Sequence, residues 1–381
     1  MSLKGVKVLE LAGLAPAPFC GMLLADFGAS VIRVDKPGAA QLDSLGNGKR
    51  SIALNLKCAD GVNIFKKLSD ECDVIIDPYR KGVMEKLRLG PHDLMPTNRK
   101  LIYARLTGFG QDGPYSNMAG HDINYVGLSG LLSLFGRHGE KPTPPVNFAA
   151  DFGGGGLMCA FGILVALFER NQSQRGQIID TSMVEGTAYL GSWFYRSQKI
   201  PGLWGQPRGK NILDTGAHFY DTYETKDGYH MAVGALESQF YAEFIEKLGM
   251  TEEDLPQFDD FENGRKKLAA IFKTKTQDEW CKIFDGSDAC VTPILTLQNV
   301  ASNPHNRAQK SFAVGKDNLM VPKPAPRLSR TPGVSCALEK PNICPGENSL
   351  EILEEYKFTA EEIKNFVENG VIQQSDKMSK L

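Results

Sequence analysis

Apolar runs and amphipathic segments take turns along the first half of the chain. Short apolar runs predict strands, and segments whose apolar residues recur every three or four positions predict helices. The predicted strands cover residues 6–11, 30–34, 51–56, 73–76, 101–106 and 177–181. The predicted helices cover residues 18–27, 60–69, 83–87, 122–135 and 152–169, and a further one begins at Val184. This alternation, with short connections, is typical of a parallel sheet covered by helices.

The pattern changes near Tyr195. Residues 196–216 are rich in glycine, proline and single charges, which predicts a linker. Two strands around a Lys226-Asp227-Gly228 turn, followed by helices, predict a second region of mixed structure. These strands cover residues 218–223 and 230–233, and the helices cover 238–248, 265–272 and 277–284. After a proline-rich connector, two amphipathic helices are predicted at residues 349–356 and 360–369.

The first strand, helix and second strand have the order of a dinucleotide-binding unit, with Asp35 after the second strand. Such a unit needs a glycine-rich turn that lets the backbone approach a pyrophosphate closely. Residues 13–18 contain no GxGxxG pattern and include two prolines. The sequence therefore argues against a dinucleotide cofactor.

Composition narrows the classes of function. The chain of 381 residues is 42% hydrophobic and 23% charged, as is typical of a soluble globular protein. Its formal net charge of −2 gives no electrostatic reason to expect a nucleic acid as partner. Its eight cysteines have no CxxC spacing, and its six histidines do not pair at i and i+4. We therefore expect free thiols in a reducing compartment and no metal site.

Three features of the sequence concern the cellular compartment of the protein. The first residues lack a secretory signal. The most apolar segment, Leu157 to Phe168, has about 12 residues, whereas a helix needs about 20 to span a bilayer, so no membrane span is expected. The chain ends in Ser379-Lys380-Leu381, the tripeptide that the peroxisomal import receptor binds. We expect a peroxisomal protein and allow for a second, mitochondrial pool.

The candidate chemistry lies between Gly120 and Gly156. His121 stands in a polar turn just before a predicted helix, where backbone N–H groups are unpaired. A lone histidine in a loop is more often a surface residue, but an imidazole also suits a base that must pass its proton on. Asp151 comes just before four glycines and a long apolar helix. It could be a proton carrier or only the N-cap of that helix.

The four glycines, Gly153 to Gly156, indicate more than a cap. Each costs about 1 kcal/mol of helix propensity, and capping does not require them. They are explained if a ligand approaches the backbone closely, with amides directed at an oxygen that becomes negative. Further along, Glu237 could be an ordinary carboxylate at a helix start or a partner that orients a histidine. Tyr220 could be a core residue or a hydrogen-bond donor to Asp151.

Basic residues follow several of the predicted strands. In an open α/β sheet, ligands bind outside the carboxyl ends of the strands. A phosphate-rich coenzyme would find its charge partners at that edge. The basic residues in question are Arg33, Lys36, Lys49, Arg50, Lys57, Arg80, Lys81 and Lys86.

Six longer motifs follow one another along the chain. They are ELAGLAPAPFCGMLLADFGASVIRVDKPG, RKGVMEKLRLGP, LIYARLTGFGQ, GHDINY, ADFGGGGLMCAFGILVALFER and ACVTPILT. Together they resemble the α-methylacyl-CoA racemase family, which belongs to the family III CoA-transferase group. GHDINY followed by ADFGGG is the specific part, and the likeness covers nearly the whole chain.

The resemblance implies an α/β fold with a large Rossmann-like parallel-sheet domain and a smaller α+β domain. Residues 1–195 would form the first part of the large domain, 196–222 a linker, and 223–319 the small domain. Residues 320–381 would lead back to the large domain. Two chains would interlock as a homodimer, with each active site between the large domain of one chain and the small domain of the other.

The resemblance also implies roles for the site residues. His121, supported by Glu237, and Asp151, with Tyr220 nearby, would be catalytic. Apart from the resemblance, we nominate the backbone N–H of Asp122 as a donor to the enolate oxygen. Coenzyme A contacts would fall on Lys36, Leu54, Asn55, Leu56, Lys57, Arg80, Lys86, Gly120, Ile123, Asn124 and Tyr125.

Two of the expected coenzyme contacts depart from the family pattern. Lys36 and Lys86 stand where an arginine is common. A lysine binds phosphate as a point charge and not through two parallel hydrogen bonds, so these contacts would be weaker without any change in the chemistry.

The implied reaction is the racemisation of 2-methylacyl-CoA thioesters, which serves the breakdown of branched-chain fatty acids and bile-acid intermediates. The hydrogen next to a thioester is weakly acidic, because the charge left behind spreads onto the carbonyl oxygen. His121 would remove it from one face and protonated Asp151 would deliver a proton to the other, with the roles exchanged for the other epimer. No metal, flavin or nicotinamide is needed. The alternatives are a CoA transferase with Asp151 as nucleophile and a non-catalytic acyl-CoA binding protein.

Overall fold

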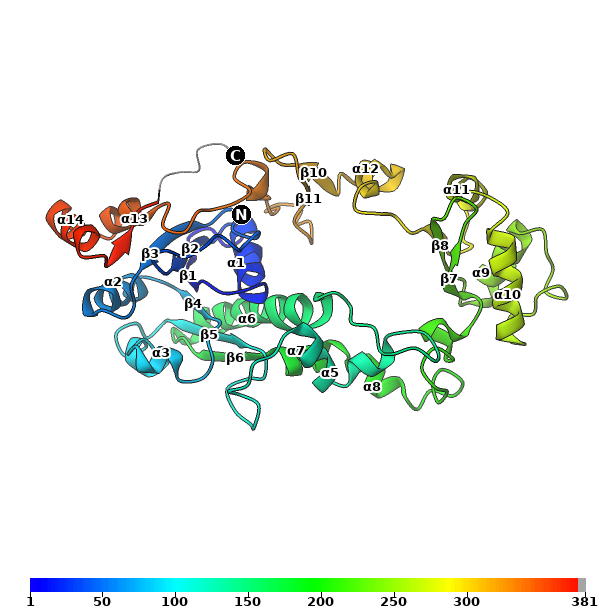
Figure 1. Cartoon of the computed structure of the whole chain (residues 1–381), viewed down its shortest axis with the longest axis horizontal. Helices are drawn as coiled ribbons and strands as arrows, with labels where there is room; N and C mark the ends of the chain where they lie inside the picture. The colour runs from blue at the N-terminus through cyan, green and yellow to red at the C-terminus, as the bar shows by residue number, and fades with distance from the viewer. Residues whose placement is uncertain (376–381) are drawn as a thin grey trace. The chain divides into compact units, whose positions relative to one another are not determined.

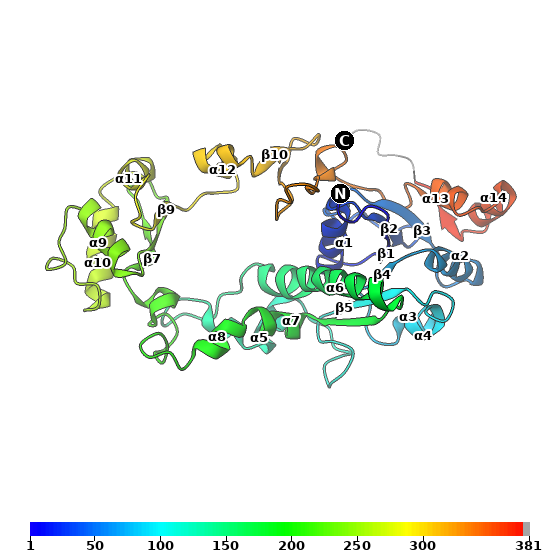
Figure 2. The same cartoon turned by 180° about the vertical axis from the view of Figure 1, so that it is seen from behind.

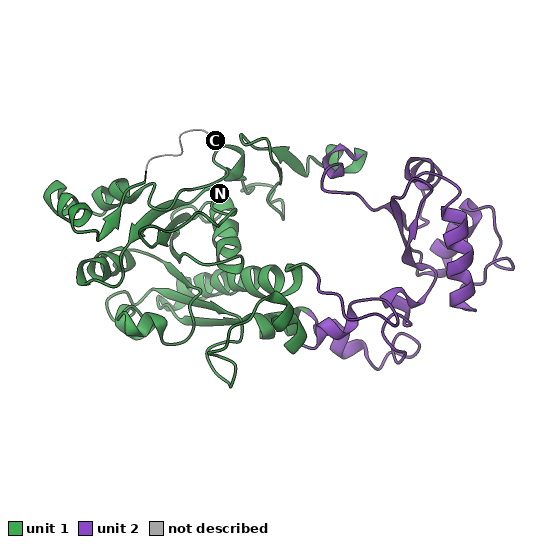
Figure 3. Cartoon of the chain, viewed as in Figure 1, with its two compact units in different colours: residues 1–129, 146–190, 304–381 green, residues 130–145, 191–303 purple. Residues whose placement is uncertain are grey.

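The computed structural model describes residues 1–375, so the tripeptide Ser379-Lys380-Leu381 lies outside the described residues. The chain forms two compact units (Figure 3). Unit 1 consists of residues 1–129, 146–190 and those from 304 onward, and unit 2 consists of residues 130–145 and 191–303.

Unit 1 contains a seven-stranded sheet in the order β12-β3-β2-β1-β4-β5-β6 (Figure 1). Every neighbouring pair in it is parallel except β12 with β3. The strands are β1 (Lys7–Leu11), β2 (Ser30–Asp35), β3 (Arg50–Leu54), β4 (Val74–Asp77), β5 (Ile102–Thr107), β6 (Ile178–Ser182) and β12 (Ile372–Gln373). The predicted parallel α/β sheet is confirmed. The antiparallel β12 was not predicted, because two residues are too few to give a pattern.

Most helices of unit 1 connect or cover these strands, whereas α12 (Pro304–Gln309) lies away from the sheet (Figures 1 and 2). The helices and helical turns of unit 1 are α1 (Pro16–Asp26), α2 (Ala59–Asp70), α3 (Val83–Lys86), α4 (Pro91–Leu94), α5 (Asp122–Leu128), the π-helical turn η2 (Phe148–Leu157), α6 (Met158–Ser173), α7 (Met183–Leu190), α12, the 3₁₀ turn η5 (Cys336–Leu338), α13 (Ser349–Glu355) and α14 (Ala360–Glu368). A hairpin of β10 (Phe312–Val314) and β11 (Met320–Pro322) precedes η5.

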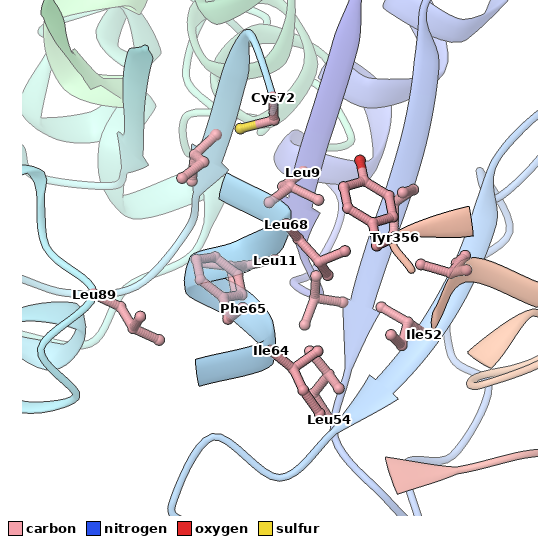
Figure 4. Packing of buried hydrophobic residues seen from close by; sticks show 14 of the residues in the cluster. Leu9, Leu11, Ile52, Leu54, Ile64, Phe65, Leu68, Cys72, Leu89 and Tyr356 are labelled. Atoms are coloured by element: carbon pink, nitrogen blue, oxygen red, sulfur yellow. The ribbon is translucent and has the colours of Figure 1, made fainter. Parts of the chain in front are cut away.

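The core of unit 1 joins the two ends of the chain. Leu9 and Leu11 of β1, at the period of two that a strand requires, share one buried cluster with Phe65 of α2 and with Ile352 and Tyr356 near α13. Figure 4 shows part of this packing. Each fully buried side chain of this kind contributes about 1.5–3 kcal/mol. The C-terminal helices are therefore part of the unit that holds the sheet.

Unit 2 has its own antiparallel sheet and its own core. The sheet has the order β7-β8-β9, with strands Tyr220–Glu224, His230–Gly234 and Val291–Pro293. Helices α9 (Ser238–Lys247), α10 (Phe261–Phe272) and α11 (Gln277–Phe284) pack an aromatic cluster against it that includes Phe219, Tyr241 and Trp280. The remaining turns and helices of this unit are η1 (Leu131–Leu134), α8 (Ser192–Ser197), η3 (Ile212–Gly216) and η4 (Val300–Ser302).

The bounds of the units differ from the predicted division of the chain at Tyr195. Residues 130–145 belong to unit 2, because Arg137 donates two hydrogen bonds to the Asp221 carboxylate, at 3.1 and 2.8 Å. The segment predicted as a linker is also structured. Asn211 within it is buried, and its side chain bonds to Asp214 at 2.7 Å.

Two predicted helices have other bounds in the structure. The helix predicted over 122–135 ends at Leu128, and a separate 3₁₀ turn follows. Gly130 between them has φ +82°, a left-handed conformation that ends a helix. The helix predicted from Phe152 starts four residues earlier, at Phe148, and continues to Ser173.

That long helix corrects the argument from the length of the apolar run. Residues 148–173 are, by length and composition alone, enough to cross a membrane. Half of their most apolar window is buried inside the protein, as in the core helix of a globular unit.

Candidate active site

His121 stands at the start of α5, in the connection that follows β5. Its extended backbone makes it the N-cap residue, and its N–H donates to Oδ1 of Asn124 at 3.0 Å. The imidazole is exposed. The turn thus holds the backbone of His121 and leaves its ring free to meet a ligand.

Asp151 lies in the first turn of η2 and is buried. The helix begins at Phe148 after Asn147, so the alternative that Asp151 only caps it is wrong. Asn147 has φ +61°, and its Nδ2 donates to Oδ2 of Asp151 at 2.8 Å. Insertions of π-helix are rare and are frequent at functional sites.

Asp122 joins these two elements. Its Oδ1 accepts hydrogen bonds from the backbone N–H groups of Ala150 and Asp151, each at 2.8 Å. Its Oδ2 is buried and has no hydrogen-bond partner among the described residues. A side chain next to His121 therefore fixes the backbone of Asp151.

The surroundings of Asp151 favour its protonated form. Burial raises the pKa of its carboxyl group above the ordinary value for aspartate. The hydrogen bond from Asn147 lowers this pKa, the negative charge of Asp122 raises it, and His121 lowers it. The net direction is upward, which suits a group that must carry a proton to the substrate.

His121 and Asp151 line the same pocket, which has a volume of about 340 Å³. The other lining residues are Gly13, Leu14, Pro16, Pro78, Tyr79, Arg80, Leu106, Thr107, Gly108, Phe109, Ser116, Met118, Gly120, Tyr125 and Met183. The sequence-predicted residues Arg80, Gly120 and Tyr125 thus share the pocket with the proton-transfer candidates. Asn124 is not part of this lining but holds His121, and the exposed Ile123 is not part of this lining either.

A second pocket, of about 570 Å³, lies at the carboxyl ends of β2 and β3. It is lined by Lys36, Leu54, Asn55, Leu56, Lys57 and Lys86 together with Val34, Asp35, Pro37, Tyr79, Val83 and Leu87. Six of the predicted coenzyme contacts are therefore brought together. Because Tyr79 lines both pockets, they adjoin.

Not all of the basic residues at the strand ends can serve a coenzyme. Lys49 is fully buried and pairs with Glu10 at 2.8 Å. Arg33 is buried and pairs with Asp35 and Asp43. Arg50 forms half-exposed ion pairs with Glu351 and Glu355. Lys81 forms an exposed ion pair with Asp112. For Arg33 and Lys49 the predicted role in binding phosphate is wrong, because each charge is already neutralised inside the protein.

The four glycines have a different cause from the one predicted. A Cβ on Gly154 would collide with the side chain and backbone of Thr187 in α7. A Cβ on Gly156 would lie 2.7 Å from the carbonyl oxygen of Pro16 in α1. The glycines let neighbouring helices approach η2, so no ligand is needed to explain them.

Tyr220 and Glu237 belong to unit 2. Tyr220 begins β7 and is 37% exposed, and Glu237 is the exposed N-cap residue of α9. Their expected partnership with Asp151 and His121 stays a prediction.

The roles of two residues of the site, Asn147 and Tyr79, were not predicted from the sequence. Asn147 could have been found from its spacing of four residues before Asp151, which places both on one side of a helical turn. Tyr79 could have been found from its position just after β4, at the same sheet edge as the lysines. Its hydroxyl donates to the carbonyl oxygen of Ala12 at 3.3 Å and so joins two loops at this edge.

The described residues offer no group of three or more histidine, cysteine or acidic side chains that could hold a metal ion. The expectation that no cofactor is needed stays a prediction.

Comparison with known proteins places the chain in a family. The sequence model of CoA-transferase family III matches residues 3–347 of the chain. The chain belongs to CoA-transferase family III. This family III chain is 55% identical to an alpha-methylacyl-CoA racemase of Mus musculus over 99% of both chains. It is 51% identical to an alpha-methylacyl-CoA racemase of Homo sapiens over 98% of both chains.

The fold has a counterpart among solved structures. A CAIB/BAIF family protein from Brucella suis superposes with a TM-score of 0.77 at 25% sequence identity. The match covers 93% of this family III chain and 99% of the other. The predicted family and fold class are confirmed.

Proposed function

We propose that this protein is an isomerase that interconverts the (2R) and (2S) forms of 2-methylacyl-CoA thioesters. The observation that carries the proposal is the pairing of exposed His121 with buried, protonation-prone Asp151 around one pocket. High identity to two alpha-methylacyl-CoA racemases supports the same reaction.

The reaction needs two groups that exchange roles. For one epimer, His121 removes the α-proton while neutral Asp151 donates a proton to the opposite face of the enolate. For the other epimer, ionised Asp151 is the base and the protonated imidazole is the acid. Positioned acids and bases each supply about 10²–10⁴-fold in rate.

Further groups would stabilise the enolate and hold the acid–base pair. The N–H of Asp122, in the first turn of α5, has no partner within its helix and is our candidate donor to the enolate oxygen. Glu237 would orient His121, and Tyr220 would donate to Asp151.

The coenzyme would occupy the pocket at the ends of β2 and β3. Lys36, Lys57 and Lys86 line it and form no ion pair with another described residue. Their ammonium groups would meet the phosphates, and the thioester would pass Tyr79 to reach His121 and Asp151. A single assay of coenzyme affinity in Lys36→Ala and Lys57→Ala tests this placement, since both should weaken binding.

The transferase alternative uses Asp151 as a nucleophile that forms a mixed anhydride. The family name favours it, whereas the raised pKa of Asp151 disfavours the ionised carboxylate that would have to attack the thioester. A transferase also needs no base opposite the aspartate.

One experiment separates the alternatives. A single epimer of a 2-methylacyl-CoA is incubated with the protein in D₂O without an acceptor acid. Epimerisation with deuterium at C2 supports the racemase. Product that forms only after a free acid is added supports the transferase, and binding without either reaction supports a non-catalytic protein.

A further inference from the structure

The Asp122 side chain does more than its position beside His121 suggests. Its Oδ1 holds two backbone N–H groups at the start of η2, and its Oδ2 has no partner among the described residues. The residue is 2% exposed, and no described lysine or arginine forms an ion pair with it. A buried carboxylate without a cation is costly.

Holding these two backbone N–H groups does not by itself require a negative charge. An asparagine has the same shape, and its carbonyl oxygen could accept the same two N–H groups. A carboxylate at this place is therefore better explained by what its charge does to its neighbour.

The neighbour is Asp151, whose backbone N–H it binds. The groups that face Asp151 are Asn147 from the same turn, His121 and Asp122 from the start of α5, and Tyr125 one turn further on. Arg80, on the β4–α3 connection, lines the same pocket. Among these groups, Asp122 is the one whose charge opposes ionisation of Asp151.

We propose that Asp122 is a positioning residue for the racemisation: its carboxylate ties the backbone of Asp151 to the turn that carries His121, and its negative charge beside Asp151 opposes the ionisation of that carboxyl group. This inference rests on the proposed function. It assigns to the side chain a task separate from the donor role of the Asp122 backbone.

The test is the pH profile of Asp122→Asn. Without the charge, Asp151 loses its proton more easily, so the limb of the kcat/KM profile that reports Asp151 moves to lower pH by about half a unit or more. The shift must be equal for both epimers. The two reactive forms of the enzyme contain the same number of protons, and the ratio of kcat/KM in the two directions is fixed by the equilibrium between the epimers.

A matched control is Asp278→Asn. Asp278 is also an acidic residue in the first turn of a helix, but it is exposed, in α11 of unit 2. The Asp278→Asn substitution should leave both limbs of the kcat/KM profile at the same pH. If Asp122→Asn does not fold, Asp122→Ser can replace it in the test. Serine keeps a hydroxyl acceptor without the charge, so the expected shift of the limb is the same.

An unmoved profile in folded Asp122→Asn would overturn the inference, because bracing would then be the whole role of the side chain. Loss of activity without a shift in either limb would overturn it as well. Absence of α-proton exchange in the unaltered protein would instead overturn the proposed function.

Discussion

Three buried carboxyl groups in unit 1 share one electrostatic effect but differ in their partners. Burial raises the pKa values of Glu10, Asp77 and Asp151, because a charge is poorly solvated inside the protein. Glu10 has the ammonium group of Lys49 at 2.8 Å and no opening to solvent. Asp151 has an amide instead of a cation and faces a pocket. This difference separates a structural ion pair from an acid that can exchange its proton with a ligand.

The acid–base pair is tested by His121→Ala and Asp151→Ala. Each should reduce epimerisation by at least about 10²-fold, because neither face of the substrate can be served without its proton carrier. Coenzyme affinity should stay within about tenfold, since the lysine-lined pocket is unchanged. Deuterium incorporation at C2 and equilibrium binding of coenzyme A measure the two quantities. Near-full activity in either variant would remove that residue from the mechanism.

Asp77 allows a test of stability against pH. Its pKa is raised to about 6 by burial, even though Tyr79 N–H and the Tyr103 hydroxyl donate to it. The folded state binds this proton more tightly than the unfolded state, so stability is lost as the pH rises through about 6. Asp77→Asn keeps the acceptor for Tyr79 and removes the charge.

We expect Asp77→Asn to stabilise the protein at pH 8 by up to about 3 kcal/mol and to change little at pH 4. Urea unfolding at both values measures this. Asp77→Ala is the control, because loss of the acceptor should destabilise the protein at both values. An equal effect of Asp77→Asn at pH 4 and pH 8 would contradict the raised pKa.

At the level of elements, the turn η2 makes the site possible. Its glycines have almost no helix propensity, and tertiary packing provides the stability that the turn lacks locally. Thr187 of α7 and Pro16 of α1 press against it. Asp151 is therefore placed by a turn that these two helices hold in common.

Gly154→Ala and Gly162→Ala test this packing. An added methyl group at Gly154 collides with Thr187, so we expect a loss of about 1–3 kcal/mol in unfolding free energy. At Gly162 in α6 the nearest atom, Cγ2 of Ile179, is 3.4 Å away, so alanine should stabilise the helix by up to about 1 kcal/mol. Chemical denaturation of both variants measures the contrast. A stable Gly154→Ala protein would show that η2 adjusts freely.

At the scale of the whole molecule, helix α6 has two different sides. One side packs on β5, β6 and α1, and the other exposes a stripe of large apolar residues. The stripe consists of Phe161, Leu164, Val165 and Phe168 of α6 together with Leu157, the last residue of η2. Contiguous apolar patches on a soluble protein mark interaction sites. If the expected homodimer forms, a second copy of the chain would cover this stripe.

In that case, Phe161→Lys combined with Phe168→Lys should shift the protein from the expected dimer to a monomer, because two buried charges would lack partners in the interface. Analytical ultracentrifugation measures the mass in solution. Val367→Lys in α14 is the control, since this residue is also exposed and apolar but lies outside the stripe. An unchanged dimer in the double variant would place the interface elsewhere.

Local sequence pattern determined the strands, most helices and the parallel sheet, because periods of two and of about 3.6 residues record which side of an element is buried. It also singled out His121, Asp151 and the lysines after the strands. Tertiary structure alone decided which basic residues stay free. Lys49 meets Glu10, and Arg33 meets Asp43, only through the register of strands and the course of loops. It also decided that the glycines serve α1 and α7, and that Asp122 holds Asp151. The period of a segment reports its own burial, whereas a pairing between distant residues depends on where the fold brings both of them.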